Sequence, residues 1–116
     1  MRVARLVVAL AVLGLAWACA PARVPTPTAP AFPDFLAPDA PPASESRAAA
    51  EHALAWQWLQ AGDLARAERG FLAALKADPS FIPSSIGLGW VDVARRRGAP
   101  ALDRFDRVLQ TQTGSA

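Results

Sequence analysis

The sequence has few of the side chains that catalysis uses most often. It contains one histidine, His52, and one cysteine, Cys19. It has no glycine-rich phosphate loop, no cluster at metal-ligand spacing and no Ser/His/Asp arrangement. We therefore expect neither an enzyme nor a bound cofactor or metal ion.

Charge of one sign is also scarce. The formal net charge is +2. Arg2 and Arg5 lie in the basic N-terminal stretch, and without them ten basic side chains balance ten acidic ones. Nucleic-acid binding needs a basic surface that replaces the counterions around the phosphates. The composition therefore argues against a nucleic-acid partner.

Residues 1–18 resemble a secretory signal peptide, with a basic start and an apolar run over residues 6–18. That run is too short to cross a bilayer comfortably, since about 20 apolar residues are needed. Cys19 follows directly and has no second cysteine with which to form a disulfide. Its position resembles that of the lipid-carrying first residue of mature bacterial lipoproteins. The alternatives are cleavage after Ala18, which would give an unlipidated exported protein, and an uncleaved signal anchor.

The lipoprotein resemblance implies a place in the bacterial cell envelope, with membrane attachment through lipid on Cys19. Ala20, after the cysteine, is not the aspartate that resembles an inner-membrane retention signal. This favours the outer membrane, with the protein facing the periplasm.

Residues 19–43 contain eight prolines, so neither helix nor sheet can propagate through them. We expect a disordered, extended tether with a reach on the order of 70 Å. Within it, residues 32–36 (Phe-Pro-Asp-Phe-Leu) are more apolar than a spacer requires. They either fold back on the domain or act as a short docking peptide.

Residues 44–111 carry the apolar spacing of amphipathic helices. Gly62 can take the left-handed conformation that ends a helix, and Asp63 can cap the next one. Asp78 precedes Pro79 and is therefore pushed out of the α region, which ends the second helix. The predicted helices cover residues 46–61, 65–77, 81–96 and 100–111, followed by a disordered tail at 112–116.

The second helix carries Ala67, Phe71, Ala74-Leu75 and Asp78-Pro79. This pattern resembles the tetratricopeptide repeat (TPR), which stacks helical hairpins into a solenoid. A shift of 34 residues, the period of that family, places similar residues in register without a gap. The pairs are Leu54/Leu88, Ala55/Gly89, Ala67/Ala101, Phe71/Phe105, Ala74/Val108 and Leu75/Leu109. The resemblance covers residues 48–111 and implies an all-α fold of two antiparallel hairpins, a fragment of an α-solenoid.

In the TPR family the first helix of each repeat lines the concave face. The groove positions that the resemblance implies here are His52, Trp56, Gln60, Ile86, Trp90 and Ala94. Two tryptophans at equivalent positions suit an apolar or proline-containing peptide. Three interpretations stay open: a partner's peptide, the chain's own residues 32–36, or plain packing. Trp58, Phe71 and Phe105 are assigned to the core.

The resulting expectation is a lipid-anchored envelope protein that mediates protein–protein interaction as an adaptor or assembly scaffold. Its partner would be a protein or peptide in the cell envelope. The alternative is a structural subunit whose repeats complete a larger helical complex or a homo-oligomer, because two repeats leave an apolar face uncovered after Leu109.

Overall fold

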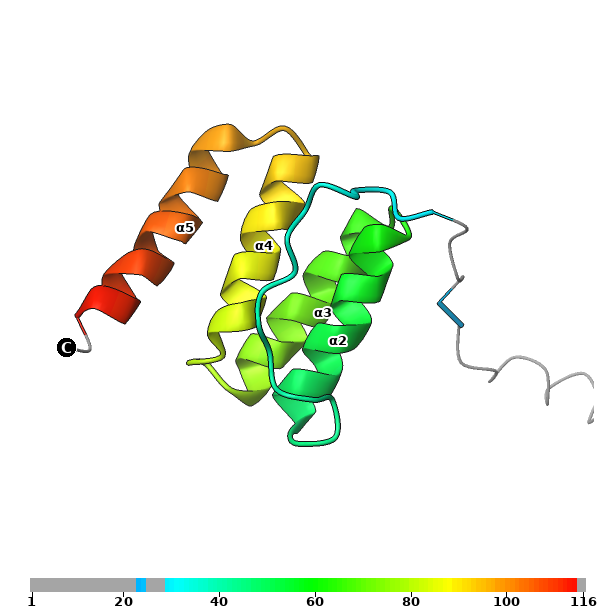
Figure 1. The fold of residues 1–116 in the computed structure, drawn as a ribbon, viewed down its shortest axis with the longest axis horizontal. Helices are drawn as coiled ribbons and strands as arrows, with labels where there is room; N and C mark the ends of the chain where they lie inside the picture. Colours follow the sequence, from blue (N-terminus) through cyan, green and yellow to red (C-terminus); the bar gives the residue numbers. More distant parts are fainter. Residues whose placement is uncertain (1–22, 25–28, 115–116) are drawn as a thin grey trace, which may run out of the picture.

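The chain is all-helical in the residues described by the computed structural model, which are 23–24 and 29–114. The signal peptide and Cys19 lie outside those residues. The described part contains no strand, and its helices are α2 (Arg47–Gln60), α3 (Leu64–Ala77), α4 (Ile82–Ala94) and α5 (Gly98–Thr113) (Figure 1). The prediction of four helices is confirmed, with bounds that differ by one or two residues.

The sequence signals at the helix ends act as expected. Ser46 caps α2 by accepting a hydrogen bond on its hydroxyl, and Asp63 caps α3 with its carboxylate. Helix α3 ends before Pro79, after an extended Asp78. The C-terminal end differs from the prediction, because α5 continues to Thr113 and takes up part of the expected tail.

The two hairpin turns, α2–α3 and α4–α5, have the same backbone geometry 34 residues apart. Each has a left-handed residue after the helix, Gly62 with φ +82° and Arg96 with φ +59°. Each closes with the two hydrogen bonds of a Schellman motif. In donor-to-acceptor order these are Gly62 N–Leu59 O, Asp63 N–Trp58 O, Arg96 N–Val93 O and Arg97 N–Asp92 O, at 2.8 to 3.0 Å. The sequence offset thus corresponds to a repeated local structure.

The helices pack as neighbours in chain order, and among them α5 contacts only α4 (Figure 1). The main core cluster comprises Ala55, Trp58, Leu59, Ala67, Phe71, Leu88 and Val91. Glycine allows close approach where α4 crosses α3: a Cβ on Gly87 would lie 2.4 Å from the Phe71 ring. The aromatic ring and the missing side chain therefore fix where the second hairpin sits on the first.

The core assignment of the three aromatic residues holds for two of them. Trp58 and Phe71 are buried, and Phe71 has no exposed surface. Phe105 is only half-buried, which corrects the prediction. It occupies the repeat position of Phe71, but no helix follows α5 in the described residues to cover it.

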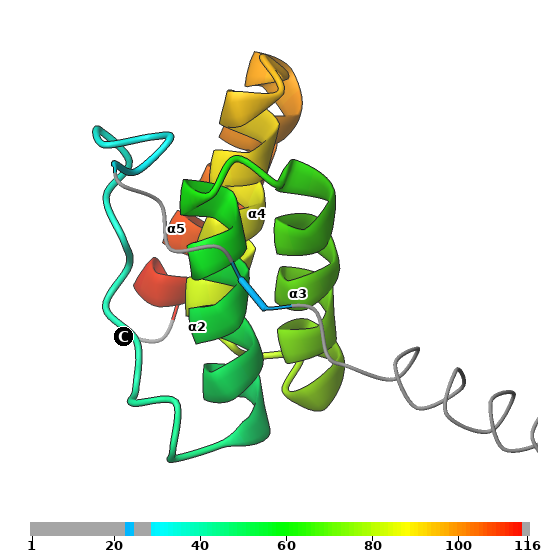
Figure 2. The same ribbon diagram turned by 90° about the vertical axis from the view of Figure 1, so that its right-hand side faces the viewer.

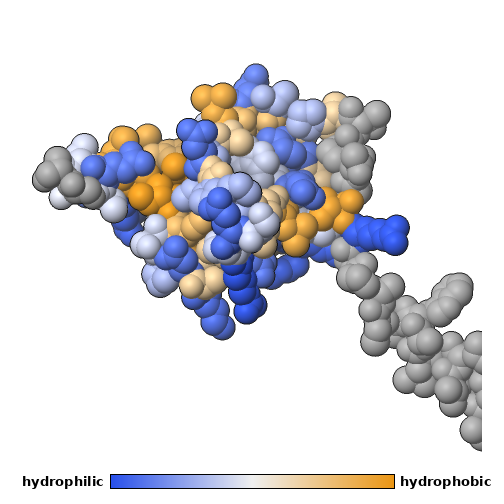
Figure 3. Space-filling model, turned by 60° about the horizontal axis from the view of Figure 1, so that its bottom comes forward, coloured by the Kyte–Doolittle hydropathy of each residue, from blue (hydrophilic) through white to orange (hydrophobic). Residues whose placement is uncertain are grey.

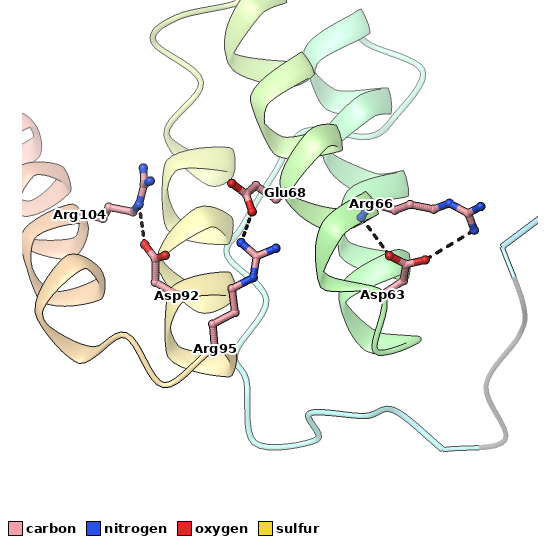
Figure 4. A network of polar contacts seen from close by, with 6 residues as sticks. All are labelled: Asp63, Arg66, Glu68, Asp92, Arg95 and Arg104. Atoms are coloured by element: carbon pink, nitrogen blue, oxygen red, sulfur yellow. Dashed lines mark hydrogen bonds and ion pairs between the residues drawn. The ribbon is translucent and has the colours of Figure 1, made fainter.

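Ion pairs link neighbouring helices at one end of the bundle (Figure 4). Glu68 of α3 pairs with Arg95 at the end of α4. Asp92 of α4 pairs with Arg104 of α5 at 2.7 Å. Both pairs join elements that the apolar core already brings together, and a partly exposed pair of this kind adds on the order of 0–1 kcal/mol.

The segment before α2 lies against the helices. Residues 29–46 run along the side of α2 that faces away from α3 (Figures 1 and 2). Phe32 and Phe35 pack on the main core cluster. The predicted disordered tether at 19–43 therefore does not describe residues 31–36, because two aromatic rings find an apolar surface within reach.

Candidate functional site

The strongest candidate site is the face of α2 and α4 that carries Trp56, Gln60 and Trp90, which we call the α2–α4 face. Residues 31–36 of the chain lie on it, and we call them the docked segment. None of the helices in the described residues is both long and apolar enough to cross a membrane. The described residues also contain no group of three or more side chains that could hold a metal ion.

Gln60 holds the backbone of the docked segment. Its Oε1 accepts from the Phe32 amide N–H at 3.1 Å, and its Nε2 donates to the Phe32 carbonyl at 3.1 Å. The carbonyl of Gln60 itself accepts from the Ala31 N–H at 2.7 Å. That last bond satisfies one of the carbonyls that the end of a helix leaves without an intrahelical partner. The site thus binds main-chain groups, which every residue except proline offers in full.

Trp90 holds the side chains of the docked segment. A turn closed by a hydrogen bond from the Phe35 N–H to the Phe32 carbonyl puts the two phenyl rings face to face, with centroids 4.7 Å apart. Phe35 stacks in turn on the Trp90 indole at 4.5 Å. The Trp90 Nε1 donates to the Leu36 carbonyl at 3.1 Å. The other side of Trp90 meets Phe105 edge-on at 5.6 Å, so four rings form one continuous stack from the segment to α5.

An apolar groove continues from the docked segment toward α5. Its volume is about 460 Å³, and it is lined by Leu36, Ala37, Pro38, Ile86, Trp90, Phe105, Val108, Leu109 and Gln112. Leu36 and Leu109 are 77% and 57% exposed. Hydrophobic surface is visible at the left of Figure 3, the α5 side of the molecule in Figure 1.

His52 does not line the groove, in contrast to its expected position. It is 5% exposed and packs against Phe71 and Phe81, with ring centroids 5.4 and 5.7 Å away. Its Nδ1 lies 3.1 Å from the Ser84 hydroxyl. Burial lowers the pKa of His52 because the charged imidazolium would lose its hydration. It is a hydrogen-bonded core side chain between α2 and α4.

The remaining groove positions fall into two groups. Gln60 and Trp90 contact the docked segment, and Ile86 lines the adjacent groove. Trp56 is half-buried against the main core cluster, and Ala94 is half-buried near the end of α4. The structure thus brings two of the six predicted residues together around one segment of chain.

Sequence reasoning missed the backbone role of Gln60 and the place of Phe105 in the ring stack. The Phe32/Phe35 spacing in a proline-rich stretch was the available signal for the segment. No comparable signal marks Gln60, because an amide that binds main-chain atoms requires no matching side chain.

No family model matches this chain, and neither a curated protein nor a solved structure matches it. The argument for function therefore rests on the residues of the α2–α4 face.

Proposed function

We propose that this protein is a non-enzymatic adaptor that binds a peptide segment of a partner protein on its α2–α4 face. The observation that carries the proposal is the docked segment, which this face holds by main-chain hydrogen bonds and aromatic stacking. A face that binds one extended aromatic segment has the chemistry to bind another.

The contacts suit moderate, reversible binding. A hydrogen bond adds about 0.5–1.5 kcal/mol net, and a stacked aromatic pair about 0.5–1.5 kcal/mol beyond its buried area. The Gln60 and Trp90 contacts are few and partly exposed, and side-chain ordering opposes them. An adaptor that exchanges partners needs affinities in this range.

We further propose that the helices are two TPR-like repeats and that the protein is lipid-anchored through Cys19. The matching Schellman turns at Gly62 and Arg96 support the repeat assignment. The lipoprotein-like sequence before Cys19 supports the anchor and a place in the cell envelope, at the outer membrane facing the periplasm.

A structural subunit is the second candidate, and the outer surface of α5 favours it. Leu102 and Leu109 of this helix are 65% and 57% exposed, seven residues apart. A spacing of seven puts both on one face of the helix, which a further helix or a second copy would cover.

Crosslinking and affinity capture from intact cells would test the adaptor function. The native chain is compared with Trp56→Ala/Trp90→Ala and with Leu72→Ala, a control that removes a half-exposed leucine of α3 instead. Circular dichroism first establishes that each variant is helical.

The adaptor function requires a discrete partner that the native chain and the control capture and that the folded double variant loses. Capture that persists in the double variant would contradict it. Capture lost only in a Leu102→Ser/Leu109→Ser variant would favour the structural subunit.

A further inference from the structure

The docked segment occupies the surface that the proposed function assigns to a partner. We propose that residues 31–36 are an intramolecular ligand that closes this site, and that the partner is a peptide with two aromatic residues at positions i and i+3 that displaces them. This inference rests on the proposed function and adds the partner's class and the regulation of the site.

The docked segment can leave without opening the core. The buried members of the main core cluster all come from α2, α3 and α4, whereas Phe32 and Phe35 are partly buried and lie on its surface. Ala31, Pro33, Asp34 and Leu36 are exposed. Residues 37–46 connect the segment to α2 without a helix, so they can pivot while α2 stays in place.

The contacts define what a displacing peptide must offer. The first aromatic residue needs a free N–H and a carbonyl for Gln60, and the second needs a ring for Trp90. The next residue supplies only a carbonyl to the indole N–H, because the Leu36 side chain is 77% exposed. The two residues between the aromatics are exposed and are not read. The motif is therefore aromatic-x-x-aromatic, with a tight turn between the rings.

Tethering makes the docked segment an effective competitor. A ligand on a short flexible linker acts at a local concentration on the order of millimolar. The apparent affinity for a free peptide falls by the fraction of molecules in which the site is open. Weakening the docked segment should therefore strengthen binding in trans.

The test uses a synthetic fluorescent peptide with the sequence of residues 29–38 and the full chain. The native chain is compared with Phe32→Ala/Phe35→Ala, and Leu72→Ala again serves as the matched control. We expect the double variant to bind the peptide at least about tenfold more tightly than the native chain or the control. A peptide with alanine at both phenylalanines should not bind, and adding Gln60→Ala/Trp90→Ala to the variant should abolish binding.

Equal or weaker binding by a folded Phe32→Ala/Phe35→Ala variant overturns the proposal. If that variant loses its helical signal, amide exchange in the native chain decides instead. Exchange of the Phe32 amide that is faster than that of buried Leu59, and faster still with added peptide carrying a non-native aromatic-x-x-aromatic sequence, supports displacement. Exchange of both amides at one rate overturns it.

The outcomes separate this inference from the adaptor function. A folded variant that fails to bind the peptide, while the native chain still captures a partner through Trp56 and Trp90, removes the gating and leaves the adaptor. Peptide binding without any cellular partner shows a closed peptide site and removes the adaptor.

Discussion

The two hairpins share a backbone pattern and differ in how much of it is covered. The first, α2–α3, is flanked by α4 and by the docked segment. The second, α4–α5, is covered on the α4 side alone. Phe71 is fully buried and the equivalent Phe105 is half-buried. Equivalent positions in a repeat thus acquire different burial from their place in the stack.

The side chains near the turns differ in the same direction. The first hairpin pairs Trp58 with Gly70, and Arg66 lies over the Trp58 ring at 4.5 Å. At the positions 34 residues later, the second hairpin has Asp92 and Arg104, which form an ion pair. The enclosed hairpin uses an aromatic side chain where the outer one uses charges that water can reach.

Truncating the two equivalent phenylalanines should show the largest difference. We expect Phe71→Ala to lower the free energy of unfolding by about 3–5 kcal/mol, because a fully buried ring leaves a cavity. Phe105→Ala should cost less than half as much, because solvent already reaches the ring. Urea denaturation followed by circular dichroism measures both, and equal losses would contradict the comparison.

Filling the two glycine contacts should show the next largest difference. A Cβ on Gly87 would lie 2.4 Å from Phe71, and one on Gly89 would lie 2.5 Å from Phe105. Phe71 has no space to move, so Gly87→Ala should destabilise the protein by about 1–3 kcal/mol. Phe105 can swing outward, and alanine favours a helix by up to about 1 kcal/mol over glycine, so Gly89→Ala should be close to neutral. Thermal melts of both variants test this; a Gly89→Ala loss as large as that of Gly87→Ala would contradict it.

Exchanging the left-handed residues should give effects of opposite sign and about 1 kcal/mol. Gly62→Ala puts a Cβ into a left-handed conformation and should destabilise the turn, since its nearest neighbour, the Ala31 Cβ at 3.7 Å, causes no clash. Arg96→Gly should stabilise the second turn by relieving the same strain. Urea midpoints at equal slope measure both, and a destabilised Arg96→Gly would show that the Arg96 side chain matters more than its backbone.

The smallest effect should be the pH response of His52, which has no titratable equivalent in the second hairpin, where Ile86 stands. Above the usual pKa of 6.5 the side chain is neutral in both folded and unfolded chains. As the pH falls below that value, the unfolded chain binds a proton that the folded chain resists, because burial lowers the pKa of His52. The free energy of unfolding should therefore fall between about pH 6.5 and the folded pKa.

Chemical denaturation at pH 7.5 and at pH 5.5 measures this change. His52→Gln keeps a hydrogen-bonding group near Ser84 and should remove the part of the change due to His52. An unchanged pH response in that variant would assign it to other groups.

Local signals made the helices predictable. Ser46, Gly62, Asp63 and Pro79 act on the backbone within a few residues, so their effects can be read without the tertiary structure. Burial depends on what lies opposite, so His52 and Phe105 were placed wrongly from periodicity alone. The groove positions Gln60 and Trp90 were named correctly as neighbours of the surface, but their ligand and the backbone contact of Gln60 were left open.

The sequence by itself determined the helical hairpins and their repeat, because caps, left-handed turns and apolar spacing are local or periodic properties. Only the tertiary structure decided that the proline-rich stretch folds back at residues 31–36. Proline prevents regular hydrogen bonding within that stretch but not contact with another surface. Whether Phe32 and Phe35 stay in water depends on the distant Gln60 and Trp90, which come within reach only when α2 and α4 are packed together.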